Sequence, residues 1–191
     1  MPASKQTKSS PATRKPAARA ASSKSAARRN GSAASANEAI AQLTEDHAKV
    51  KKLFKQYERL AQDEADESER QELASLICTE LTAHATAEEE IFYPAAREAL
   101  EEPDLIDEAE VEHATAKDLI AQIQASTPED PMFDAKVKVL GEYINHHVQE
   151  EEGEMFPKVR KTKLDTVALG EEIAARKAEI KEELGAEVAH D

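Results

Sequence analysis

Six side chains that can bind a metal ion recur at matching places in the two halves of this 191-residue chain. Each half supplies two histidines and one glutamate, and the second set follows the first by 63 to 66 residues: His47, His84, Glu88, His113, His147 and Glu151. The surrounding letters repeat too, as D/E-H-A-x-x-x-K and then H-x-x-x-E-E with an aromatic-Pro end. Two imidazoles and a carboxylate suit non-haem iron with open coordination positions. The repeat therefore predicts two metal ions in one protein.

The elements that must position these residues are helices. Apolar residues recur at alternating steps of three and four, which is typical of amphipathic helices with one narrow apolar seam. Four such stripes cover residues 40–61, 73–95, 106–123 and 137–155. The links between them are short, at 63–68, 101–103 and 126–131, which favours antiparallel neighbours. We therefore predict an all-α protein whose domain, residues 37–160, is an up-down-up-down antiparallel four-helix bundle.

The six polar residues occupy seam positions that Leu or Ile would otherwise fill. His84 and Glu88, like His147 and Glu151, are four residues apart and so share a helix face. A buried, unpaired carboxylate costs several kcal/mol, about 3 to 5, and neither of these two seams offers a Lys or Arg to pair with it. Bound cations would remove that cost, while the lack of thiolates argues against a structural zinc of the finger type. A metal-free bundle with core histidines is the plainer alternative.

This constellation resembles the hemerythrin-like family, also called the HHE cation-binding domain, over roughly residues 38–160. The resemblance rests on the two lone histidines and the two H-x-x-x-E motifs already listed. It implies a four-helix bundle that encloses two iron ions, bridged by Glu88, Glu151 and an oxo or hydroxo oxygen. Manganese and zinc are the less favoured metals. Ferritin-like bundles use Glu-x-x-His instead, and that order does not match this chain.

One position departs from the oxygen-carrying members of that family. They have a second histidine one turn after the helix-three ligand, and here that position is Lys117. Four histidines in place of five leave one iron less saturated. The departure weakens the case for simple reversible oxygen carriage and favours chemistry with oxygen, peroxide or nitric oxide.

Further residues are expected around the metals. Tyr57 lies on the same seam as His47 and is either core or a phenol beside the cavity, and Lys117 either faces a bound anion or extends into solvent. His146 is about 100° around the helix from His147, so we expect it in solvent or at a helix boundary, with a displaced fifth ligand as the alternative. Three phenylalanines are expected to wall the site: Phe54, Phe92 and Phe156.

The charge is unevenly distributed along the chain. Residues 1–36 carry eight Lys or Arg and no acid, whereas the whole chain has a formal net charge of −14. These 36 residues also contain no Leu, Ile, Val or aromatic residue, so we predict a disordered basic tail. A solubilising tail, a nonspecific nucleic-acid-binding arm and an organelle transit peptide all remain open. Without a signal-type apolar segment, a cytoplasmic location is expected.

Residues 161–191 form the last predicted region. A stripe from Leu164 to Leu184 predicts a helix that docks on the bundle or on a partner subunit, and Gly185 marks its end. No apolar run approaches the roughly 18 residues of a membrane span. The single cysteine, Cys78, excludes intramolecular disulfides. The sequence does not set the oligomeric state.

Three functions agree with these features. The first is a di-iron protein that binds or reacts with a small diatomic molecule or a peroxide, as an enzyme or otherwise. The second is an iron-sensing or storage module, in which metal occupancy alters folding and partner contacts. The third is a metal-dependent interaction protein that associates with DNA through its basic tail.

Overall fold

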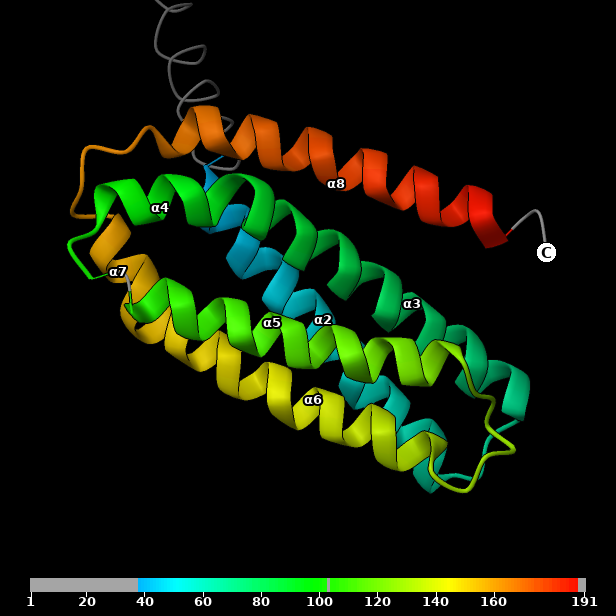
Figure 1. Cartoon of the computed structure of the whole chain (residues 1–191). Helices are drawn as coiled ribbons and strands as arrows, with labels where there is room; N and C mark the ends of the chain where they lie inside the picture. Colours follow the sequence, from blue (N-terminus) through cyan, green and yellow to red (C-terminus); the bar gives the residue numbers. More distant parts are fainter. Residues whose placement is uncertain (1–37, 103, 189–191) are drawn as a thin grey trace, which may run out of the picture.

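The computed structural model describes residues 38–102 and 104–188, and the predicted tail at 1–36 lies outside that range. Four long helical segments run antiparallel and are joined by short loops at alternating ends (Figure 1). The segments are α2 (Ala39–Gln62); α3 (Glu67–Ala87), η1 (Glu88–Phe92) and α4 (Tyr93–Ala99); α5 (Asp104–Gln124); and α6 (Phe133–Glu150), η2 (Glu151–Met155) and α7 (Phe156–Val159). This arrangement confirms the predicted all-α, up-down-up-down bundle.

Two apolar clusters fill the bundle, one towards each end. The first cluster includes Ile40, Leu43, Phe92, Ile106 and Phe156. The second is built mainly from the other half of each helix and includes Val50, Ile77, Ile120, Phe133 and Leu140. Between the two clusters lies the level of the bundle at which the six predicted ligands are buried. The two clusters therefore hold a polar layer in an otherwise apolar core.

Two π-turns interrupt the second and fourth segments at equivalent places. In each, the backbone N–H before a proline donates to a carbonyl five residues back: Tyr93 to Glu88, and Phe156 to Glu151. A proline inside a regular α-helix clashes with the carbonyl four residues earlier and cannot donate. The wider turn lets the helix continue past Pro94, and the π-turn in η2 does the same in the fourth segment. π-turns often lie at functional sites, and both of these begin at a predicted glutamate ligand.

A fifth helix, α8 (Thr166–Val188), lies along the outside of the bundle beside α3 (Figure 1). Its Ile173 and Ile180 are buried, and Ile173 joins the first apolar cluster. The Gln42 side chain on α2 donates to the Gly170 carbonyl at 2.9 Å. This helix was predicted to dock on the bundle or on a partner subunit, and in the structure it packs on the bundle of its own chain.

No helix within the described ranges is both long enough and apolar enough to cross a membrane.

Candidate metal centre

The six predicted ligands converge from four segments on one buried layer. His47 comes from α2, His113 from α5, and the two H-x-x-x-E pairs from the α3–η1 and α6–η2 junctions. All six side chains are buried, and Glu88 is fully so. The sequence pattern therefore identified a set of residues that the fold does bring together.

The histidines form two pairs with their Nε2 atoms facing each other. The Nε2–Nε2 distance is 3.2 Å between His47 and His84 in the first half. The corresponding distance is 3.1 Å between His113 and His147 in the second half. Two imidazole nitrogens at this separation can share one proton or bind a metal ion placed beside them.

Each buried glutamate spans both histidine pairs. Glu88 Oε2 lies 3.0 Å from His84 Nε2 and 3.5 Å from His113 Nε2. Glu151 Oε2 lies 3.2 Å from His47 Nε2 and 3.5 Å from His147 Nε2. A carboxylate that faces a histidine from each half stands where a bridging ligand between two metals would stand.

The carboxylate oxygens of this layer lack hydrogen-bond partners. Both oxygens of Glu88 and Oε2 of Glu151 are buried without one. An orphaned buried carboxylate oxygen is costly, and a coordinated cation removes that cost. The donor atoms fall into two groups in which all atoms lie within 4.8 Å of one another: His47, His84, Glu88 and Glu151, and then Glu88, His113 and His147. The residues therefore match two neighbouring cations that share Glu88.

A second set of carboxylates contacts the outward-facing Nδ1 atoms of the four histidines in this layer. Each Nδ1 lies within hydrogen-bond distance of one carboxylate: His47 with Glu152 at 2.9 Å, His84 with Asp46 at 3.3 Å, His113 with Glu89 at 3.1 Å and His147 with Glu112 at 2.7 Å. An Nδ1–H that donates outwards leaves the Nε2 lone pair directed at the metals and fixes the ring orientation. All four rings are therefore oriented for coordination through Nε2.

The same contacts shift the titration of the metal-free site. Burial alone would lower the pKa of His84, but Glu88 and Asp46 raise it to about 10. Burial would likewise raise the pKa of Glu151, but His47, His147 and His84 lower it to about 2. Without metal, a protonated His84 beside Glu88 and Asp46 would offset part of the cost of burying these carboxylates.

Tyr93 is a site residue that the sequence reasoning missed. Its hydroxyl donates to Glu151 Oε1 at 2.9 Å and lies 3.3 Å from His113 Nε2. Burial, together with the nearby charges of Glu151 and Glu88, raises its pKa well above the usual value, so the phenol stays protonated. A signal was present in the repeat, where the aromatic residue before proline is Tyr93 in the first copy and Phe156 in the second.

Tyr57, for which the sequence left the core and the cavity as alternatives, lies in the core. Its hydroxyl donates to Asp134 at 2.6 Å, and its ring packs in the second apolar cluster. Phe54 also packs against that cluster and not against the ligands. Phe156 does wall the site, because its ring stacks on His47 with centroids 5.8 Å apart. Phe92 supports it with an edge-on contact at 5.6 Å.

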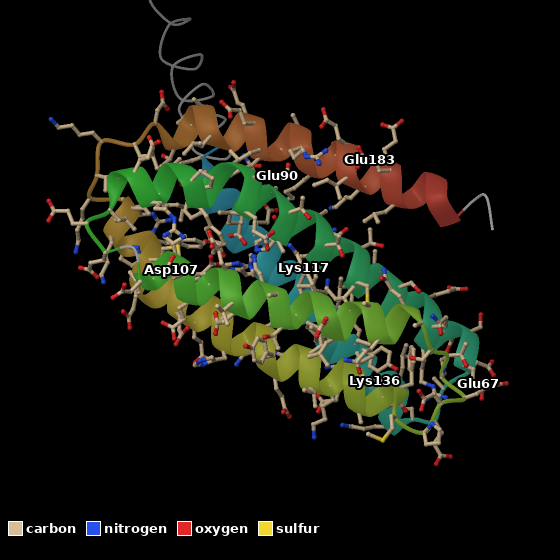
Figure 2. The ribbon with its side chains drawn as sticks, viewed as in Figure 1. Glu67, Glu90, Asp107, Lys117, Lys136 and Glu183 are labelled. Carbon is tan, nitrogen blue, oxygen red and sulfur yellow. The ribbon has the colours of Figure 1, made fainter. Side chains whose placement is uncertain are left out.

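Lys117 and His146 both lie near the ligands but do not join them. Lys117 Nζ donates to Glu89 Oε2 at 2.5 Å, and Figure 2 shows it between α3 and α5. Since Glu89 also holds His113, the lysine braces a ligand from outside. His146 has 62% of its side chain exposed and lies 3.3 Å from Glu150 Oε1, so it is not a fifth ligand of the inner layer.

The outer carboxylates were also missed, although their signal is in the repeat. Asp46 and Glu112 directly precede the lone histidines, and Glu89 and Glu152 directly follow the ligand glutamates. Their partners could not be read from sequence. Asp46 holds His84 and not its neighbour His47, while Glu152 holds His47 across the bundle.

A small enclosed cavity adjoins the four histidines. It measures about 20 Å³ and is closed on its other sides mainly by aliphatic side chains, among them Val50, Leu81, Ile120, Ile144 and Val148. That volume holds about one water-sized molecule.

A larger groove of about 630 Å³ lies between α2 and α6. It reaches His47 at its inner end and carries Lys51, Lys55 and Lys138 along its length. Gly141 lets the two helices approach here, because a Cβ at this position would lie 2.9 Å from the Phe54 ring.

A third pocket, of about 40 Å³, touches the ligands from the side of α5 and η2. Besides the predicted ligand Glu151, four glutamates line it: Glu108, Glu112, Glu150 and Glu154. The three spaces that reach the ligands therefore differ in character. One is mainly aliphatic, one carries lysines and acids in equal number, and one is acidic.

Comparison with known proteins agrees with this geometry. The family model described as the hemerythrin HHE cation binding domain matches residues 38–159. A solved structure of a hemerythrin HHE cation binding domain-containing protein from Mycobacterium kansasii has a TM-score of 0.63 and 26% identity, covering 76% of this chain and 88% of its own. A Nostoc protein named DNA nickase is 35% identical over 142 residues, which are 73% of this chain but 39% of the relative. The chain is a metal-binding member of the hemerythrin HHE cation-binding domain family.

Proposed function

We propose that the chain is a non-haem di-iron protein that binds or reacts with dioxygen, peroxide or nitric oxide. The observation that carries the proposal is a small cavity directly against four histidines whose Nε2 atoms face the buried carboxylates of Glu88 and Glu151. A set of imidazole and carboxylate ligands suits iron. A pair of ferrous ions supplies two electrons to a small oxidant when bound here.

The residues of the chain would divide the work as follows. Glu88 and Glu151 would bridge the two ions and offset their charge. The four histidines would bind the ions through Nε2, and the carboxylate at each Nδ1 would fix the orientation of the ring. The aliphatic walls exclude bulk water, which strengthens electrostatic interactions inside the cavity.

Tyr93 would give the site a proton donor. Its hydroxyl lies between Glu151 Oε1 and His113 Nε2, beside the histidine pair of the second half. A phenol at that place can donate a hydrogen bond to a small anion or oxidant.

The test begins with metal-free, full-length protein loaded with ferrous iron under anaerobic conditions. Two irons per chain, followed by a change in the optical spectrum on adding oxygen, peroxide or nitric oxide, is the expected result. Metal-dependent melting with no spectral response to any of the three would replace reactivity with the iron-sensing or storage function. The Glu88→Ala variant serves as the control without a bridging carboxylate.

A second candidate function is action on DNA. It is favoured by the similarity to a protein named DNA nickase and by the eight basic residues with no acid in 1–36. Lys and Arg that contact phosphates give salt-dependent, sequence-independent binding. The remaining residues carry a formal net charge of −22, so contact with a polyanion would fall to the tail.

Supercoiled plasmid distinguishes binding from cleavage. The full chain, a variant lacking residues 1–36 and Glu88→Ala would each be incubated with plasmid and ferrous or manganous ions. Retention that depends on the tail without conversion to the open circle would support DNA association alone. Conversion that Glu88→Ala abolishes would assign nicking to the metal centre. Absence of both retention and conversion would exclude the DNA function.

A further inference from the structure

The acidic pocket between α5 and η2 connects the protein surface to the metal ligands. Its lining includes four glutamates, Glu108, Glu112, Glu150 and Glu154, together with the ligands His147 and Glu151. Among the residues that the structure describes, none of these four glutamates has a Lys or Arg partner. The pocket therefore concentrates negative charge without an internal counter-ion.

Two glutamates of this pocket, together with the neighbouring exposed His146, have the donor geometry of a cation site. His146 Nε2 lies 3.3 Å from Glu150 Oε1 and 3.8 Å from Glu112 Oε1. One donor atom from each of these three residues lies within 4.8 Å of the other two. Imidazole with two carboxylates is again a donor set for iron, manganese or zinc.

The inner end of the pocket points to the same kind of ligand. Glu151 is 1% exposed, and its Oε2 has no hydrogen-bond partner. Glu112 joins the two ends, because its Oε2 accepts from His147 Nδ1 at 2.7 Å while its Oε1 faces His146. A cation that moves inwards from the mouth therefore passes acidic side chains until it reaches Glu151.

We propose that this pocket is the route by which divalent cations reach the centre, and that Glu112, His146 and Glu150 form a weaker acquisition site at its mouth. In the other two spaces the acids are matched by lysines, one of each in the small cavity and three of each in the groove, so neither concentrates negative charge as this pocket does. Clefts lined by one sign of charge raise the local concentration and association rate of the opposite ion. The proposal rests on the metal centre proposed above.

Loading kinetics test the route. Metal-free full-length protein would be mixed anaerobically with ferrous iron in a stopped-flow instrument, and with Co²⁺, whose visible absorption reports coordination. Glu150→Gln/Glu154→Gln should load about fivefold more slowly, because two of the four steering charges are gone, and should reach the same final occupancy of the inner layer. The control, Glu171→Gln/Glu172→Gln, removes two exposed acids from α8 and should load like the parent.

Equilibrium titration tests the acquisition site independently. The parent chain should bind a third, weaker Co²⁺ that His146→Ala loses while the two inner ions remain. Equal loading rates for the two double variants would overturn the route, and the lack of a third ion in the parent would overturn the site. A chain that takes up no metal at all would overturn the di-iron function and this inference together. Circular dichroism and melting confirm that each variant is folded.

Discussion

The two halves of the bundle carry the same ligands but present them in different surroundings. In the first half, His47 and His84 face both bridging glutamates, giving four donor side chains in one group. In the second half, His113 and His147 share only Glu88 in such a group. Glu151 faces His147 with its Oε2, 3.5 Å from Nε2, while its Oε1 accepts from the Tyr93 hydroxyl. The repeat thus builds a nearly symmetric pair of sites, and one phenol makes them unequal.

The aromatic neighbours sharpen this contrast. Phe156 stacks on His47 with an interplanar angle of 5°, and it has no polar atom to offer. Tyr93 lies against His113 at 5.3 Å with an angle of 33° and brings its hydroxyl to the ligands. The first half has an apolar ring against its histidine, whereas the second half has a hydrogen-bond donor. Under the proposed function, this donor would favour exogenous ligands on the second half.

The outer carboxylates differ as well, because α8 packs on only one side of the bundle. Lys177 on α8 donates to Asp46, the carboxylate that holds His84. On the same face Arg176 binds Glu90, and in Figure 2 Glu90 lies beneath α8. Within the described ranges, the equivalent carboxylate of the second half, Glu112, has only histidine partners. The first half is therefore braced by α8, whereas the second half is braced by Lys117 through Glu89 and adjoins the acidic pocket.

The largest expected effect comes from removing a bridging carboxylate. Glu88→Ala or Glu151→Ala should lower bound metal from two per chain to well below one, since each glutamate serves both halves. Stabilisation by a ligand present at a thousandfold over its dissociation constant is about 4 kcal/mol, so the metal-dependent rise in Tm, roughly 10 °C, should vanish too. Metal analysis and melting measure both. Tyr57→Phe, which alters a distant hydroxyl, is the control.

Loss of one ion in either variant, with the other retained, would contradict the bridging assignment.

Two of the outer carboxylates should each affect the metal bound by the other half of the repeat. Glu152 belongs to the second repeat but holds His47 of the first, and Glu89 belongs to the first but holds His113 of the second. Glu152→Gln should therefore weaken the first metal by about 10- to 100-fold, and Glu89→Gln the second by a similar factor. Competition with a chelator gives the affinities, and Mössbauer spectra of ⁵⁷Fe identify the affected ion. The reverse assignment would show that the metal-bound state pairs differently.

Substitutions at Tyr93 and Phe156 test whether the phenol makes the two halves differ in reactivity. Tyr93→Phe removes the only phenol at the ligands among the described residues and should slow the reaction with peroxide or weaken azide binding about tenfold, as expected for one lost donor. Metal content should not change. Phe156→Tyr is the matched variant and should have little effect alone. Stopped-flow absorbance makes the measurement, and equal rates for Tyr93→Phe and the parent would remove the assigned role of the phenol.

The smallest expected effect is a pH dependence confined to the metal-free protein. The pKa of His84 in the folded chain is about 10, above its usual 6.5, so its contribution to stability is complete below pH 6.5 and is lost as pH rises towards 10. The pKa of Glu151 is lowered to about 2, so its contribution is lost only as pH falls below 4.5. The Tm should therefore decline by about 5 °C above pH 6.5.

Two controls define that result. His84→Ala should flatten the alkaline decline, because the shifted group is gone. Metal-loaded protein should not show it, because a coordinated Nε2 carries no proton. A metal-free Tm that stays constant from pH 6.5 to 10 would contradict this role of a protonated His84.

Much of this architecture could be predicted from sequence, for identifiable reasons. Seam positions that hold His and Glu in place of Leu or Ile indicate a buried polar layer whatever the exact packing. The repeat then showed that the layer is contributed twice, once by each half. Lys117 was also singled out from the sequence, but its contact with Glu89 could not be foreseen.

Tyr57 and Tyr93 show where sequence reasoning stops. A seam position gives the side of a helix that faces the core but not which neighbours lie at that level, and Tyr57 is ten residues, about 15 Å along the axis, from His47. Tyr93 is five residues after Glu88, which in a regular α-helix places it about 140° away from that side. The π-turn over Glu88–Phe92 takes up the extra residue and turns the phenol inwards.

The sequence by itself determined that six predicted ligands share the interior of a helical bundle, because helical periodicity and side-chain chemistry can both be read from short segments of the chain. The tertiary structure alone decided which carboxylate holds which histidine, where the phenol points and which half α8 braces. Those contacts join residues as far as 131 positions apart. They depend on the relative height and rotation of packed helices, which no single segment specifies.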